Sequence, residues 1–175
     1  MKRLLFLLTF LPSLAFAQNY PHTQFISTSP TVDTGAYATG DLIGGKLTFT
    51  GALRNTTNAG YITSVLITDL AAQSADLELV LFSTNPTGTT FTDQAAFDVA
   101  DADVTKIVAV IALGSTSRFN FNDNGVKYLG SLAIPLGVTP ANTAGTIIYG
   151  ALVSRGTPTF AASTDVSVVL GISQD

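Results

Sequence analysis

Short runs in which hydrophobic residues alternate with other residues recur along most of the chain. The clearest run is 76–82, where Leu77, Leu79 and Leu81 alternate with Glu78 and Val80. Successive side chains of a strand point to opposite faces, so these three leucines are predicted to face a core and Glu78 to face solvent. The pattern recurs at 166–172 and at 147–153, the latter with hydrophobic residues on both faces. Alternation of this kind predicts an all-β fold.

Eight segments have the composition of strands and are separated by turn-forming residues. The predicted strands are 46–53, 61–70, 76–82, 106–113, 119–122, 127–134, 147–153 and 166–172. Segments rich in Asn, Asp, Gly and Pro at 54–60, 85–88 and 122–125 are typical of tight turns. About eight strands favour a single β-sandwich that is jelly-roll-like. An immunoglobulin-like sandwich is the alternative, although its Cys and Trp markers are missing.

One short helix is expected near 93–103, between two predicted strands. Thr92 or Asp93 would cap its N-terminus, and the following Gln and Ala residues are compatible with one or two helical turns. Phe91 and Phe97 are expected to pack over one end of the sandwich.

The N-terminus is expected to contain two segments that precede the sandwich domain at 39–175. Residues 1–17 have a basic start, an apolar run at 4–11 and small residues before a cleavage point after Ala17, which is typical of a secretory signal peptide. A hydrophobic strand or anchor is the alternative, although Pro12 interrupts the apolar run. Residues 18–38 are rich in Thr, Ser and Pro, which indicates an extended arm or edge segment, with a further strand hidden in it as an open alternative.

Charge and cysteine content exclude several classes of site. The formal charge is −4 and would become −6 without residues 1–17, which contain Lys2 and Arg3 but no acid. The remaining cations are scattered singly, whereas proteins that bind nucleic acid cluster them against phosphates. The chain has no Cys, so it has no disulfide and no thiolate nucleophile or ligand. We therefore expect no nucleic-acid partner and no cofactor.

An acidic cluster is the strongest candidate for bound chemistry. Asp93, Asp98, Asp101 and Asp103 lie in one short segment, and carboxylate oxygens are suitable ligands for calcium. Their spacing does not match an EF-hand loop. The alternative is that these residues cap a helix and end strands, because Asp hydrogen-bonds readily to nearby backbone. This alternative is favoured, and calcium is retained as a weak hypothesis.

Catalytic constellations have little support. The single His, His22, lies in the expected arm, and no Gly-x-Ser-x-Gly elbow occurs. Asp69, Asp76 and Glu78 lie close in sequence, but the separation of two carboxylates that a glycosidase needs cannot be deduced from sequence. The chain has no Trp, and its Tyr residues are dispersed, which gives little support for a sugar-binding platform. We expect that the protein is not an enzyme.

Six segments of the chain resemble a group of small structural proteins of tailed phages, encoded near other virion genes. The segments are 37–47, 61–69, 77–82, 86–97, 149–159 and 170–175. The resemblance covers most of the chain after residue 36, and its motifs are structural. It implies a virion component, such as a head decoration or minor capsid protein, whose β-sandwich docks on a capsid or tail. The export-like residues 1–17 depart from that pattern.

Two hypotheses of function follow. The first is a non-enzymatic structural protein of a phage-like particle, which binds other virion proteins or itself, as a homo-oligomer. The second is a secreted or cell-surface module that binds a glycan or protein through loops at one end of the sandwich. The expected location is the virion in the first case and the periplasm, cell surface or medium in the second. Neither hypothesis includes a stable membrane span.

Overall fold

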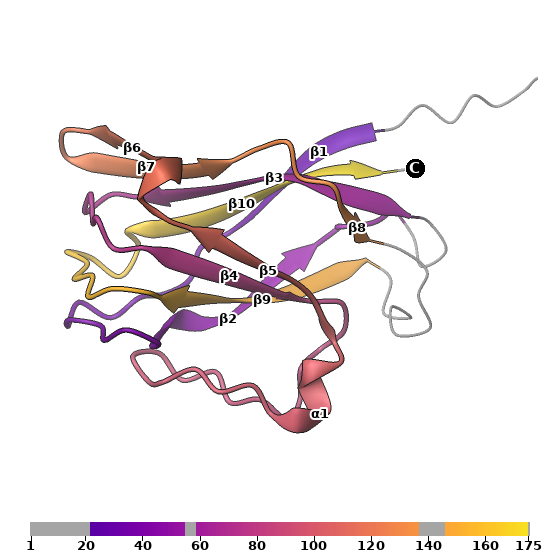
Figure 1. The fold of residues 1–175 in the computed structure, drawn as a ribbon, viewed down its shortest axis with the longest axis horizontal. Coiled ribbons are helices and arrows are strands. Elements are labelled where there is room, and N and C mark those ends of the chain that lie inside the picture. Colours follow the sequence, from indigo (N-terminus) through magenta and orange to yellow (C-terminus); the bar gives the residue numbers. More distant parts are fainter. Residues whose placement is uncertain (1–21, 55–58, 137–145, 175) are drawn as a thin grey trace, which may run out of the picture.

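Two antiparallel sheets face one another across the interior of the protein (Figure 1). The computed structural model describes residues 22–54, 59–136 and 146–174. The expected signal-like segment 1–17, residues 18–21 of the expected arm and residues 55–58 of an expected turn lie outside this part. The strands of the described residues are β1 His22–Thr28, β2 Leu42–Thr50, β3 Gly60–Asp69, β4 Leu77–Phe82, β5 Ile107–Leu113, β6 Arg118–Phe121, β7 Asn124–Leu129, β8 Ile134–Leu136, β9 Ile147–Ser154 and β10 Val166–Gln174.

The strand order confirms the predicted jelly roll. One sheet has the order β1-β10-β3-β7-β6, with β8 also paired to β3, and the other has the order β2-β9-β4-β5. Without β6 and β8, strands 1-10-3-7 face strands 2-9-4-5, and the chain crosses between the sheets at most connections. This is the arrangement of eight strands in two Greek keys that defines a jelly roll.

The core between the sheets is built from the alternation seen in the sequence. Leu77, Leu79 and Leu81 of β4 all lie in the main buried cluster, as predicted. Val168 and Leu170 of β10 contribute from the facing sheet. Each strand thus presents every second residue to the core, which determines its register.

A long connection forms a third layer over the outer face of the four-stranded sheet. Residues 83–106 join β4 to β5 and lie on the side of this sheet that faces away from the six-stranded sheet (Figure 1). Its side chains cover a second hydrophobic cluster on the outer face of the strands, which includes Leu42, Val80, Phe82, Ala151 and Val153, with Phe91, Phe97 and Val99 packed against it. This layer explains why β9 is hydrophobic on both faces.

The helix differs from the expectation. The helix α1 spans only Asp101–Val104, and the segment 93–100 is not helical. Gln94 has a φ of 59°, a left-handed conformation that a helix cannot contain. The side chain of Asp93 bonds to backbone from distant segments, so it does not begin a helix as expected.

One strand was an open alternative in the sequence analysis, and another was not assigned. Residues 22–28 of the expected arm form β1, an edge strand paired with β10 along its whole length. The three-residue β8 pairs with the start of β3. The predicted turn at 122–125 is confirmed, because Phe121 pairs with Asn124 and Asn122 has a φ of 61°.

Candidate functional site

Asp93 connects two loops near the start of β2. Its Oδ1 accepts hydrogen bonds from the Tyr37 hydroxyl at 2.8 Å and from the backbone N–H of Gly44 at 2.6 Å. Its Oδ2 accepts the backbone N–H of Asp33 at 2.9 Å. Burial and the bond to Asp93 raise the pKa of Tyr37 far above its usual range, so this hydroxyl remains a donor. The carboxylate therefore holds the loop 83–106 against the segment that follows β1.

Asp103 has a similar role at the other end of the same loop. It is fully buried, and its Oδ2 accepts the backbone N–H groups of Gly88 and Thr89 and the Thr89 hydroxyl at 2.7–2.8 Å. Its Oδ1 forms an ion pair of 2.6 Å with Lys106. The Lys106 bond and the other donors lower the pKa of Asp103 to about 2.

The other two candidate calcium ligands, Asp98 and Asp101, do not take part in the hydrogen bonds of Asp93 or Asp103, which we call loop clamps. Asp98 and Asp101 are exposed and make no side-chain hydrogen bond to another described residue. Among the described residues, no three His, Asp or Glu side chains lie together as metal ligands would. Both oxygens of Asp93 and of Asp103 already accept protein donors, and the hydrogen bonds of these two residues are those of loop clamps.

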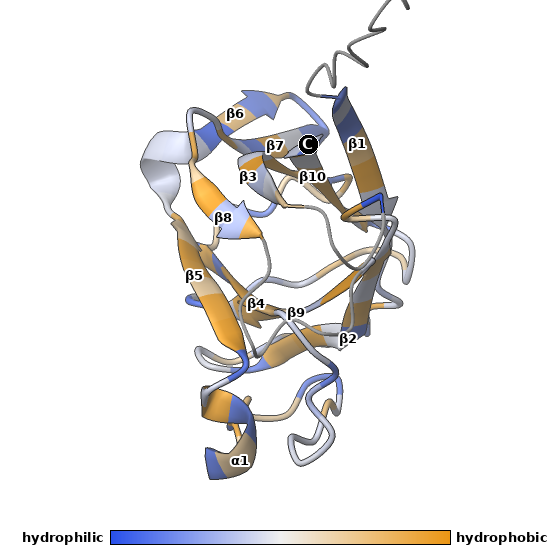
Figure 2. Cartoon of the chain, turned by 90° about the vertical axis from the view of Figure 1, so that its right-hand side faces the viewer, coloured by the Kyte–Doolittle hydropathy of each residue, from blue (hydrophilic) through white to orange (hydrophobic). Residues whose placement is uncertain are grey.

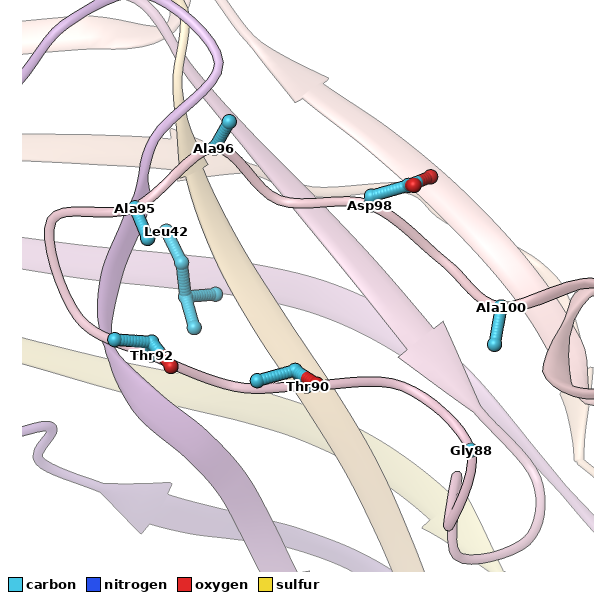
Figure 3. A pocket seen from close by; sticks show the side chains of 8 residues that line it. All are labelled: Leu42, Gly88, Thr90, Thr92, Ala95, Ala96, Asp98 and Ala100. Atoms are coloured by element: carbon cyan, nitrogen blue, oxygen red, sulfur yellow. The ribbon is translucent and has the colours of Figure 1, made fainter.

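A pocket of about 250 Å³ lies between the loop 83–106 and the start of β2. Figure 3 shows Thr90 and Thr92 on one side of it and Ala95 and Ala96 on the other, with Asp98 at its margin. Most of the lining consists of small residues and backbone.

The remaining carboxylates and the histidine are dispersed. Asp69 accepts the backbone N–H groups of Ala71 and Gln73 in the turn after β3, and burial raises its pKa. Glu78 lies on the face of β4 opposite the core leucines and makes a two-pronged ion pair with Arg155, at 2.7 and 3.1 Å. Asp76 is exposed, and His22 is exposed at the start of β1. These groups are not gathered around one pocket.

The outer face of the six-stranded sheet is the more informative surface. Residues next to core positions in β1, β10, β3, β7 and β6 point outward, because side chains alternate along a strand. On this face Leu66 lies opposite both Val169 and Tyr128, and Val126 lies opposite Phe119. Five aromatic side chains there, Phe25, Tyr61, Phe119, Phe121 and Tyr128, are exposed. We call these eight residues the aromatic face.

Charged residues do not interrupt the aromatic face. Within the described strands of this sheet, Asp69, Arg118 and Lys127 are the charged residues, and each lies on the inner side of its strand. Apart from the members of the aromatic face, the outward positions of these five strands are Ser, Thr, Asn and Gly. A water-exposed sheet normally has charged residues on such positions, so this face is unusual for a surface in permanent contact with solvent.

Phe25 shows how the aromatic face is organised at its edge. It lies opposite Gly171, and its ring would be 3.1 Å from a Cβ added there. Although the ring covers this glycine, it is 73% exposed. Phe121, at the opposite edge, is 63% exposed. The contact between Phe25 and Gly171 could not be recognised from sequence, because it depends on the register of two strands that are far apart in the chain.

Two cations lie side by side on the inner side of the same sheet. Lys127 of β7 lies directly opposite Arg118 of β6 in the register of these two paired strands. Lys127 is only 4% exposed, and neither its Nζ nor the Arg118 Nε has a hydrogen-bond partner among the described residues. Burial lowers the pKa of Lys127, although Asp76 and Asp69 oppose the shift.

Comparisons with known proteins add little to this picture. No family model matches the sequence, and no curated protein matches it. A solved structure titled Desmodium yellow mottle tymovirus matches with 11% identity over 95% of this chain and 92% of that chain, at a TM-score of 0.28. A score this low does not establish a shared fold, and the jelly-roll assignment depends on the strand order alone. None of the helices in the described residues is long and apolar enough to span a membrane.

Proposed function

We propose that this protein is a non-enzymatic structural component of a phage-like particle and that it binds the particle through the aromatic face. The proposal is supported by the uncharged character of that face, with Phe25, Phe119, Phe121 and Tyr128 exposed on it. Aromatic residues are enriched and charged residues are depleted at the centre of protein interfaces. A flat sheet face suits a large, flat partner such as a capsid or tail surface.

The size of the face is sufficient for such an interface. Five strands spaced about 4.8 Å apart, with roughly six residues each at about 3.3 Å, cover about 500 Å² of projected area. Side-chain relief increases the accessible area beyond this projection, which brings it near the ~800 Å² per partner of a typical stable interface.

Particle binding is tested by mass spectrometry of purified particles from cells that carry the gene. The chain is expected in the particle fraction, and its absence there contradicts the proposal. The double variant Phe119→Ser with Phe121→Ser is then mixed with particles that lack the chain. We expect binding to fall at least about 100-fold, because two exposed aromatic contacts are lost. The control is Leu70→Ser, since Leu70 is equally exposed but lies in the turn after β3.

The pocket beside the loop 83–106 favours a second candidate, an exported module that binds a small polar ligand or glycan. Its hydroxyl groups, from Thr90 and Thr92, are suited to hydrogen bonds with such a ligand. Recovery of the chain from the medium, free of particles and with residues 1–17 removed, would favour this candidate. The variants of the aromatic face would then leave ligand binding unchanged.

A further inference from the structure

The edge strand β5 has a composition that is unusual for an edge. Its sequence, IVAVIAL, contains no polar residue, whereas the edge strands β1, β2 and β6 contain His22, Lys46 and Arg118 respectively. Charged side chains on an edge prevent pairing with other strands, and β5 lacks this protection. Figure 2 shows β5 as a hydrophobic strand at the margin of the molecule.

One side of β5 has no paired strand among the described residues. Within the described residues, β5 pairs with β4 alone, and no other backbone hydrogen bond involves Ile107–Leu113. Val110 is 55% exposed at the middle of the strand. The register with β4 shifts at Val108, so the regular part of the edge is 109–113. An unpaired row of N–H and C=O groups beside exposed hydrophobic side chains is a template for another strand.

We propose that a second copy of this chain occupies the β5 edge, with the two β5 strands paired antiparallel about a two-fold axis. Antiparallel pairing of identical strands is self-complementary, since residue i of one copy meets residue j of the other and residue j meets residue i. The strand contains no charge, so a chain of net charge −4 meets no like-charge repulsion at this contact. Val and Ile pairs across the new ladder stabilise it. The two four-stranded sheets become one continuous sheet of twice the width.

This inference does not depend on the proposed particle role and is tested on the purified chain alone. Sedimentation velocity from about 1 µM to about 100 µM is expected to show a monomer–dimer equilibrium. Val110→Lys and Val110→Glu place like charges near the axis and are each expected to weaken the dimer at least about tenfold. An equimolar mixture of the two variants is expected to recover dimer, because opposite charges then meet.

Leu70→Lys is the matched control, since Leu70 is 54% exposed and follows β3, a strand of the other sheet. Thermal unfolding of each variant verifies that it is folded, which is expected because both positions are exposed. A wild-type chain that remains monomeric throughout overturns the proposal and leaves the edge to a strand of a different protein. Equal weakening by Leu70→Lys, or single variants that do not recover on mixing, also overturns it.

Discussion

Asp103 is the residue whose replacement should most affect the long loop. It is buried and accepts four hydrogen bonds, from Gly88, Thr89 (two bonds) and Lys106. Asp103→Asn replaces one acceptor oxygen by a donor NH₂ that faces other donors. We expect the melting temperature to fall by roughly 5 °C. Asp98→Asn is the control, because Asp98 is exposed, and a similar fall in both variants would contradict the clamp.

The pH dependence of Asp103 has a defined sign. Its pKa is about 2 in the folded protein and ordinarily 3.8, so the unfolded chain binds this proton more readily between these values. The stabilisation by its carboxylate is therefore present above pH 3.8 and lost as pH falls through about 2. In chemical denaturation series, the difference between wild type and Asp103→Asn should shrink over this range. A difference that does not change would contradict the assignment.

Lys127 is a buried amine that is expected to reduce stability. Desolvation outweighs its attraction to Asp76 and Asp69, as the direction of its pKa shift shows. Lys127→Met keeps most of the stem and removes the unpartnered ammonium, so we expect the free energy of unfolding to rise by about 1 kcal/mol at neutral pH. Lys127→Ala also removes the stem and should destabilise the protein through a cavity.

The same residue predicts a rise in wild-type stability at alkaline pH. A folded-state pKa below 10.5 means that the folded protein loses this proton first, so the unfolded chain binds more protons as pH approaches 10.5. In denaturant unfolding, the free energy of unfolding of wild type should therefore rise relative to that of Lys127→Met in that window. A difference in free energy of unfolding between wild type and Lys127→Met that does not change with pH would argue against a buried charge.

At the scale of elements, the loop 83–106 is a layer without regular structure that depends on its clamps. Asp93→Ala removes the bonds to Tyr37, Asp33 and Gly44. The loop is expected to open locally more often, and proteinase K should cleave within it at least about fivefold faster. Asp101→Ala is the control, since Asp101 is exposed and makes no bond to another described residue. Cleavage that begins in another segment would contradict the role of Asp93.

The strands could be predicted because each has to bury every second residue. This constraint is local, so Leu77, Leu79 and Leu81 were assigned correctly from seven residues of sequence. The sequence leaves β1 as an alternative only, because its polar sequence, HTQFIST, becomes a strand by pairing with β10. The helix was misplaced because Asp93 satisfies distant backbone N–H groups, which resembles a helix cap in sequence.

The candidate site depended on information that the sequence does not contain. Phe25 and Phe119 are separated by nearly a hundred positions, and only the strand order places them on one face. Only 11% of the residues are charged, but this composition does not indicate that the outer face of one sheet has no charged residue in its described strands. By contrast, the acidic cluster was conspicuous in sequence, although the structure separates Asp93 and Asp103 into two clamps.

For the whole molecule, the two proposed surfaces have a geometric consequence. A two-fold axis between antiparallel neighbours runs perpendicular to their sheet. Pairing of β5 would therefore place the six-stranded sheets of both copies on the same side of the joined four-stranded sheets. The two aromatic faces of the dimer would then point to the same side and could dock on one particle surface together. Bivalent docking of this kind strengthens binding without any new contact.

This arrangement predicts that a variant remote from the aromatic face will weaken particle binding. Val110→Lys is expected to bind particles about 100-fold more weakly than Leu70→Lys, because it docks through one face instead of two. The double variant Phe119→Ser with Phe121→Ser should lose particle binding while its sedimentation remains that of wild type. If wild type is a dimer and Val110→Lys binds particles as tightly as Leu70→Lys, the two faces do not engage together. The direction of the two-fold axis would then have to differ from the one that a continuous sheet requires.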